Sequence, residues 1–145
     1  MFSLPYRETG NAPLTETPLI SIVDDDELSR VAIGDFVASL GFSARTFGSA
    51  EAFLQSSSVG ETRCLILDVQ MPKMSGFELQ EHLSQSGVDL PIIFITAFSD
   101  AGAKTRALKA GAICFLDKPA GLRGPQLVDC LRTALSRGEG FASRA

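Results

Sequence analysis

The chain has 145 residues, the size of a single domain, so a two-domain enzyme is excluded. Apolar residues make up 45% of it and charged residues 21%, enough for a hydrophobic core, which excludes a disordered polymer. The net charge is −4 and the isoelectric point is about 4.9, so the chain lacks the positive potential that attracts phosphate backbones and anionic membranes. We therefore expect no direct binding of nucleic acid.

The two ends of the sequence differ from its middle. Residues 1–17 contain two prolines and mixed charge, and no basic segment leads into an apolar one, which argues against a signal peptide. The longest apolar run, 91–98, is far shorter than the roughly 20 residues of a membrane span. We expect a flexible arm over 1–17, one folded domain over 18–138, a tail over 139–145, and a cytoplasmic protein without membrane contact.

Cysteine and histidine indicate neither a disulfide framework nor a zinc site. Cys64, Cys114 and Cys130 are odd in number, widely spaced and set in apolar runs, so we expect all three to be buried free thiols. His82, the single histidine, lies in a polar stretch. We expect it on a solvated helix face, without the further ligands that zinc requires.

The hydrophobic pattern predicts five strands, each followed by a helix. The strands are short, β-branched and continuously apolar, which is typical of a parallel sheet buried on both faces. In chain order they cover 19–23, 42–47, 64–67, 92–95 and 112–116. The helices have apolar residues at helical spacing and cover 27–40, 49–55, 75–86, 100–109 and 125–137.

This alternation predicts an α/β fold, a flavodoxin-like doubly wound parallel sheet of five strands between two helical layers. Right-handed crossovers favour the strand order 2-1-3-4-5, with a topological switch point between the first and third strands. Ligands of such sheets bind at that point, beyond the carboxyl ends of the strands.

Polar side chains follow four of the five strands at that edge. They are Asp24, Asp25 and Asp26 after the first strand, Asp68 after the third, Thr96 after the fourth and Lys118 after the fifth. Clustered carboxylates beside a sheet edge repel one another unless a cation balances them. Oxygen ligands without thiol or imidazole favour Mg²⁺ over zinc.

Helix capping is the simpler interpretation of the three aspartates, with Asp26 as N-cap. Against it, four separate strand ends each supply a group that phosphoryl transfer requires. Asp68, alone at a central strand end, is the predicted nucleophile, because carboxylates form acyl phosphates. Asp24 and Asp25 are the predicted metal ligands, and the predicted donors to the phosphoryl oxygens are Thr96 after the fourth strand and Lys118 after the fifth.

At these residues the sequence resembles the receiver domain of two-component response regulators, and within it the FixJ-type branch. The resemblance covers about residues 19–137. It is carried, in this order, by VDDDE (23–27), LDVQMPKMSGFEL (67–79), ITA (95–97), ALKAGA (107–112) and FLDKP (115–119).

The resemblance implies that a sensor histidine kinase, or a histidine phosphotransfer protein, donates a phosphoryl group to Asp68. It implies that Asp25, Asp68 and the main-chain carbonyl of Gln70 ligate Mg²⁺ directly, while Asp24 acts through a water. We expect Mn²⁺ to substitute for Mg²⁺. The chain would catalyse only its own phosphorylation and dephosphorylation, so it is expected to be a signalling domain and not an enzyme.

By the same resemblance, Thr96 swings toward the phosphoryl group and Phe115 rotates inward behind it. Lys118 would precede a cis peptide bond to Pro119, which places its ammonium in the site. The resulting two-state switch would be read on the face of the fourth helix, fifth strand and fifth helix, where a homodimer could also form.

Four further residues are candidates for control of the site. Gln70 and Phe98 flank it: Gln70 can bind the water that hydrolyses the acyl phosphate, and Phe98 would exclude that water if its ring folds over the mouth. Leu28 and Val31, near the start of the first helix, are candidates for a kinase-facing surface. Helical periodicity supports equally that Leu28 belongs to the core.

Two other functions are alternatives to a receiver domain. A phosphatase of the haloacid dehalogenase type requires an acidic residue two positions after its nucleophile, and Gln70 stands there. A flavodoxin-like binding module requires a loop that accepts phosphate, which the aspartates after the first strand would repel. Because no DNA-binding helix-turn-helix follows Gly138, we expect signalling through a downstream protein partner, or through an output domain of a longer regulator.

Overall fold

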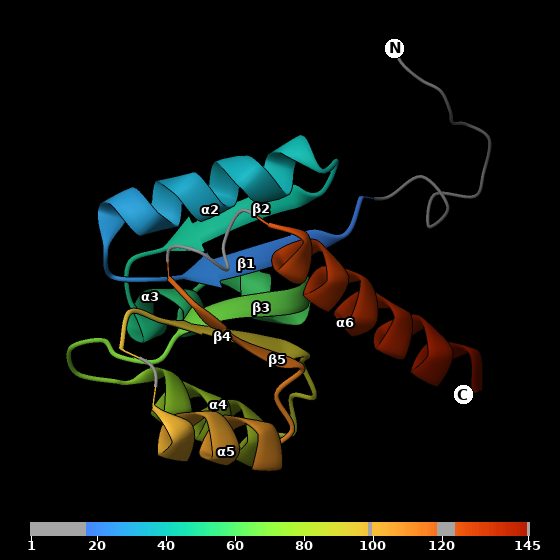
Figure 1. The fold of residues 1–145 in the computed structure, drawn as a ribbon. Coiled ribbons are helices and arrows are strands. Elements are labelled where there is room, and N and C mark those ends of the chain that lie inside the picture. Colours follow the sequence, from blue (N-terminus) through green and yellow to red (C-terminus); the bar gives the residue numbers. More distant parts are fainter. Residues whose placement is uncertain (1–16, 99, 119–123, 145) are drawn as a thin grey trace.

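The computed structural model describes residues 17–98, 100–118 and 124–144. Its strands form a single parallel sheet in the order β2-β1-β3-β4-β5, with helices on both faces (Figure 1). The bounds are β1 Leu19–Val23, β2 Ser43–Phe47, β3 Thr62–Asp68, β4 Ile92–Thr96 and β5 Cys114–Asp117. The predicted doubly wound fold and strand order are confirmed.

The helices lie in two layers, with α2 and α6 on one face of the sheet and α3, α4 and α5 on the other (Figure 1). Their bounds are α2 Glu27–Ser39, α3 Ala50–Leu54, α4 Gly76–Gln85, α5 Ala101–Lys109 and α6 Pro125–Arg144, with a 3₁₀ turn, η1, at Ser57–Gly60. Helix α6 continues past Arg137, where we expected it to end, so part of the expected tail is helical. The division at residue 138 stays a prediction.

The sheet separates two hydrophobic cores, because successive residues of a strand point to opposite faces. Ile20, Ile22 and Ile66 belong to the core under α2 and α6. Leu65 and Leu67 belong to the core under α3, α4 and α5. Burial on both faces explains why the strands read as continuous apolar runs, and it fixes the register that places the strand ends.

Local hydrogen bonds set the helix ends nearest that edge. Helix α4 begins with a capping box, in which the Ser75 hydroxyl accepts from the Glu78 N–H and the Glu78 carboxylate accepts from the Ser75 N–H. Asp100 is the N-cap residue of α5, and its carboxylate accepts from the Ala103 N–H. At the opposite edge of the sheet, Gly41 just after α2 has φ +98°, a conformation that glycine adopts without steric cost.

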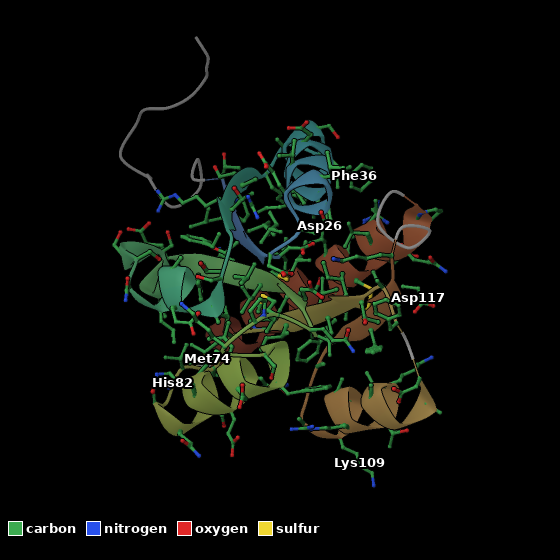
Figure 2. All side chains as sticks on the ribbon, turned by 90° about the vertical axis from the view of Figure 1, so that its left-hand side faces the viewer. Asp26, Phe36, Met74, His82, Lys109 and Asp117 are labelled. Atoms are coloured by element: carbon green, nitrogen blue, oxygen red, sulfur yellow. A yellow bond between two sulfur atoms is a disulfide. The ribbon has the colours of Figure 1, made fainter. Side chains whose placement is uncertain are left out.

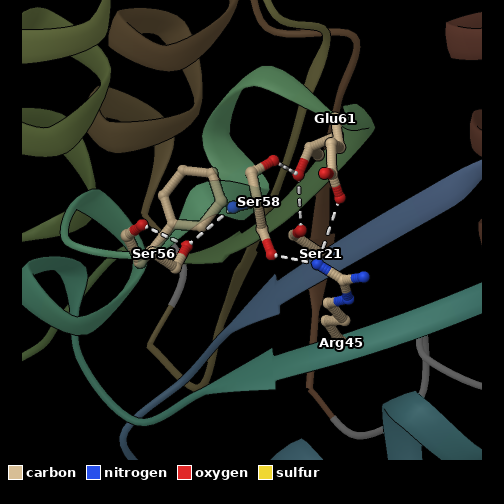
Figure 3. A network of polar contacts seen from close by, with 7 residues as sticks. Ser21, Arg45, Ser56, Ser58 and Glu61 are labelled. Carbon is tan, nitrogen blue, oxygen red and sulfur yellow. Dashed lines mark hydrogen bonds and ion pairs between the residues drawn. The ribbon is translucent and has the colours of Figure 1, made fainter.

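A polar network joins the amino-terminal half of the sheet to the turn before β3 (Figure 3). The buried Ser21 hydroxyl lies 2.6 Å from the Thr62 hydroxyl, which donates to the Ser58 carbonyl at 2.6 Å. Arg45 donates to the Ser58 hydroxyl at 2.8 Å and to Glu61 at 3.2 Å. These bonds satisfy the one serine inside β1 and lie away from the carboxyl edge of the sheet.

The expectation of three free thiols is wrong for two of them. Cys114 of β5 and Cys130 of α6 form a disulfide, with Cα atoms 6.1 Å apart, while Cys64 is free and buried as expected. Residues 16 positions apart meet because α6 packs across β5. The helical position of His82 on α4, exposed to solvent, is as predicted.

No helix within the described ranges is long and apolar enough to cross a membrane. Pro119, and with it the expected cis peptide bond, lies outside the described residues, as does most of the predicted arm over 1–17.

Candidate functional site

The parallel register brings four strand ends to one edge of the sheet. Val23 pairs with Leu67 across β1 and β3, Asp68 with Ile95 across β3 and β4, and Thr96 with Asp117 across β4 and β5. The polar residues that the sequence places at or after these ends therefore lie next to one another. Figure 2 looks onto this edge, where Asp26, Met74 and Asp117 mark three of the surrounding elements.

The ammonium of Lys118 joins the ends of β1 and β3. Its Nζ lies 2.9 Å from Asp24 Oδ2 and donates a hydrogen bond of 3.4 Å to Asp68 Oδ2. Asp24 is fully buried and Asp68 is 4% exposed, so the three charges interact in a medium that screens them little. Lys118 therefore lies between the carboxylates at the ends of the first and third strands.

The two buried carboxyl groups have different proton affinities. Burial raises the pKa of Asp24, but Lys118 and the hydrogen bond from the Asp26 N–H outweigh it, so the pKa lies below its ordinary value. Burial and the adjacent Asp24 carboxylate raise the pKa of Asp68 to about 7, against the opposing charge of Lys118. The pKa of Lys118 is lowered by burial but raised more strongly by the two carboxylates. A single ammonium therefore does not neutralise the negative charge around Asp68.

Three carboxylates at this edge fit a hard divalent cation. One oxygen each from Asp24, Asp25 and Asp68 lies within 4.8 Å of the others. Asp24 Oδ2 is buried, and within the described part of the chain it receives no hydrogen bond of good geometry, although Lys118 lies beside it. Such an oxygen retains a lone pair for a further positive partner. An all-oxygen donor set that includes the exposed Asp25 matches the preferences of Mg²⁺.

The side chain of Asp26 does not cap α2 as the capping interpretation expects. Asp26 occupies the N-cap position of α2, but its side chain accepts no capping hydrogen bond. Its N–H instead donates to Asp24 Oδ1 at 3.0 Å. The N–H of Asp26 therefore orients a carboxylate of the cluster.

The loop after β3 holds Asp68 from the other side. The Gln70 N–H donates to Asp68 Oδ1 at 3.3 Å. The Gly76 N–H donates to the Val69 carbonyl at 2.9 Å, which draws the first turn of α4 against the end of the strand. A Cβ at position 76 would overlap the carbonyl oxygen of Asp68. Position 76 therefore accepts only glycine without displacement of the main chain that carries Asp68.

Sequence reasoning missed Arg30 and gave Gly76 no separate role. Arg30 Nη1 donates to the Asp24 main-chain carbonyl at 2.8 Å, and its guanidinium lies against Gly48 after β2. Its hydrogen bond thus ties α2 to the end of β1. The signal for Arg30 was its position one helical turn after Asp26, but many exposed arginines share such a spacing. The signal for Gly76 was a glycine inside the first turn of a helix.

The remaining candidates lie around the site in different environments. Thr96 is 1% exposed, and its Oγ1 accepts a hydrogen bond of 3.1 Å from the Phe98 N–H. Phe115 is half-buried and packs with the core under α3, α4 and α5. Phe98 is 72% exposed, so its ring is turned mostly to solvent. Of the two arrangements considered for Phe98, the outward one is present.

A doubly wound sheet with three carboxylates and one lysine at its switch point defines a class of phosphoacceptor domains. Residues 20–131 match the family model of the response regulator receiver domain. The chain belongs to this family and is a receiver domain of two-component response regulators, which is a signalling domain.

The relatives by sequence agree with this assignment. Response regulator protein TmoT of Ectopseudomonas mendocina is 44% identical over 117 residues, which are 81% of this chain and 52% of that protein. Transcriptional regulatory protein FixJ of Rhizobium meliloti is 37% identical over 100 residues, 69% of this chain and 49% of that protein. The chain thus spans about half the length of these curated relatives, and the resemblance to FixJ is confirmed.

Solved structures agree as well. Response regulator StyR superposes with a TM-score of 0.79 at 39% identity, covering 89% of this chain and 65% of that one. The structure of FixJ-N superposes with a TM-score of 0.73 at 31% identity, covering 84% and 96%.

We predict that Gly76→Ala destabilises the domain by about 1–3 kcal/mol, because the added methyl group overlaps the main chain of Asp68. It should also slow labelling by acetyl phosphate. Gly60→Ala is the matched control, since a Cβ there meets open space. Urea unfolding and mass spectrometry measure the two effects. Equal behaviour of both variants would show that the glycine is dispensable.

Proposed function

We propose that Asp68 is the phosphoacceptor of this receiver and that it takes a phosphoryl group from a phosphohistidine of a sensor histidine kinase or a histidine phosphotransfer protein. The observation that carries the proposal is the Lys118 ammonium held between Asp24 and Asp68. In the transfer, a carboxylate oxygen of Asp68 bonds to phosphorus as the bond from phosphorus to the histidine nitrogen breaks. Lys118 is placed to stabilise the negative charge of the transferred group.

Asp24, Asp25 and Asp68, with the main-chain carbonyl of Gln70, would hold Mg²⁺, and Mn²⁺ would substitute. When bound, the ion supplies positive charge for the phosphoryl oxygens. This set is favoured because three carboxylates face one ammonium and because burial raises the pKa of Asp68 to about 7 in the absence of a metal. The receiver would catalyse only its own phosphorylation and dephosphorylation.

The switch would pass from Asp68 through Thr96 and Phe115 to the face formed by α5, β5 and α6. Thr96 is buried at the end of β4. Phe94, two residues earlier on the same strand, pairs with Phe115 on β5. A hydroxyl drawn toward the phosphoryl group would leave room for the half-buried ring to turn inward. This face would then bind a downstream protein partner, an output domain or a second copy of the chain.

The kinase is proposed to dock on the start of α2. Leu28 and Val31 are 83% and 51% exposed, so Leu28 does not belong to the core, and both lie within the first two turns after Asp26. Exposed apolar side chains beside an acidic pocket suit a partner that must bring its phosphohistidine in line with Asp68. Sensor kinases draw on ATP in the cytoplasm, where we place this reaction.

We predict that acetyl phosphate with Mg²⁺ adds one phosphoryl group to the wild-type chain and none to Asp68→Asn, because the variant lacks the nucleophilic oxygen. Intact-protein mass spectrometry measures the addition. Asp89→Asn, an exposed aspartate with the same change of charge, is the control and should label like wild type. Labelling of Asp68→Asn at the wild-type rate would rule out Asp68 as the acceptor.

We predict that Asp25→Ala weakens Mg²⁺ binding roughly tenfold or more, since one of three carboxylates is lost. Isothermal titration calorimetry on the unphosphorylated chain gives the affinity. The matched control is Asp35→Ala, which removes an exposed carboxylate on α2 outside the cluster. An affinity equal to that of the control would remove Asp25 from the metal site.

We predict that Val31→Glu slows transfer from the sensor kinase that phosphotransfer profiling selects, by roughly tenfold, because it puts a charge in an apolar contact. Labelling by acetyl phosphate should not change, since this small donor needs no docking surface. Leu108→Glu, at an exposed apolar position on α5, serves as control. If acetyl phosphate labelling falls as much as kinase transfer, Val31 acts on the site and not on docking.

A further inference from the structure

We propose that Cys114 and Cys130 form a reversible redox site, at which oxidation by a small-molecule disulfide such as glutathione disulfide locks strand β5 to helix α6. The proposal does not depend on phosphorylation at Asp68. It concerns how firmly the edge of the sheet that carries Lys118 is held.

The two sulfurs lie on elements that only packing brings together. Cys114 pairs with Ile93 on β4, and Cys130 lies in the second turn of α6. Strand β5 is the last strand of the sheet, paired with β4 alone. A bond to α6 therefore gives β5 a second, covalent attachment.

Both redox states fit the same space. Cys130 is 6% exposed and belongs to the core that contains Leu127 and Leu131, and Cys114 packs against that core. Reduced cysteines behave as small apolar side chains, so reduction leaves no buried charge and no large cavity. The fold thus tolerates the thiol pair, and a change of redox state does not require unfolding.

Solvent exposure favours Cys114 as the first cysteine to react. Its side chain is partly exposed, whereas that of Cys130 is nearly covered. The Cys114 thiolate attacks glutathione disulfide, forms a mixed disulfide and releases one glutathione thiolate. The Cys130 thiolate then attacks the Cys114 sulfur and releases the second. Two electrons pass from the cysteines to glutathione, and the two protons of the cysteine thiols end on the released glutathione.

The disulfide closes a loop that contains residues of the candidate functional site. The chain between Cys114 and Cys130 includes Phe115 and Lys118, and the latter contacts Asp24 and Asp68. Cys114 packs toward α6, while Phe115 packs toward α3, α4 and α5. Oxidation therefore fixes the strand from the face opposite to Phe115, and it restrains the main chain on both sides of Cys114.

The experiment equilibrates the purified full chain in glutathione buffers from fully reduced to fully oxidised, in the absence of any phosphodonor. After acid quenching, denaturation and alkylation with iodoacetamide, mass spectrometry counts free thiols. We expect three alkyl groups in the reduced chain and one, on Cys64, in the oxidised chain, with full return on reduction. Three groups at every ratio would overturn the site, and one group at every ratio would overturn its reversibility.

The same two states are compared by thermal unfolding and hydrogen exchange. Closing a loop of this length should raise the Tm of the oxidised chain by roughly 5–10 °C. Amide exchange in β5 and α6 should slow more than exchange in β1 and β2. Equal Tm values, or equal slowing throughout the sheet, would contradict a lock between β5 and α6.

Single variants test the order of reaction. Cys130→Ser should accumulate a glutathione adduct at Cys114, whereas Cys114→Ser should accumulate far less, because Cys130 is nearly buried. Both variants should abolish the redox dependence of the Tm, and Cys64→Ala, the matched control, should retain it. If Cys64→Ala also lost the redox dependence of its Tm, the effect would depend on Cys64 and the proposal would be wrong.

Discussion

The rest of this structure depends on a contact between opposite charges at the carboxyl edge of the sheet, where Lys118 lies between Asp24 and Asp68. Removing an isolated carboxylate from water costs several kcal/mol. Here two are nearly covered, and a third, Asp25, lies beside them. One ammonium opposes three carboxylates, so the cluster keeps a negative excess. Burial and the adjacent Asp24 carboxylate raise the pKa of Asp68, and the negative excess is what we propose a divalent cation balances.

Several parts of the fold hold this cluster. The Asp26 N–H orients the Asp24 side chain, and Arg30 binds the Asp24 carbonyl. Gly76 lets α4 begin directly against the main chain of Asp68. Each contact comes from a different loop or helix, and none of them involves the hydrophobic cores. The cores set the sheet, and these local contacts then position the side chains of the site.

The two helical layers separate the surfaces around the cluster. The exposed apolar residues Leu28 and Val31 lie on α2, beside the first strand. Phe115 faces the opposite layer, and the disulfide ties β5 to α6 on the same layer as α2. The proposed docking surface and the disulfide therefore lie on one face of the sheet, and Phe115 packs on the other.

The sequence by itself determined the fold class, the strand order and the groups at the strand ends, because continuous apolar strands and right-handed crossovers leave few arrangements. It also determined that Asp68 and Lys118 would meet. Only the tertiary structure decided the rest. The Cys114–Cys130 bond follows from how α6 packs on β5, and no local pattern specifies that packing. The approach of the Arg30 guanidinium to Gly48 depends likewise on residues distant in the chain. Periodicity specifies which face of an element is buried, whereas the partner that covers it is chosen by packing of the whole domain.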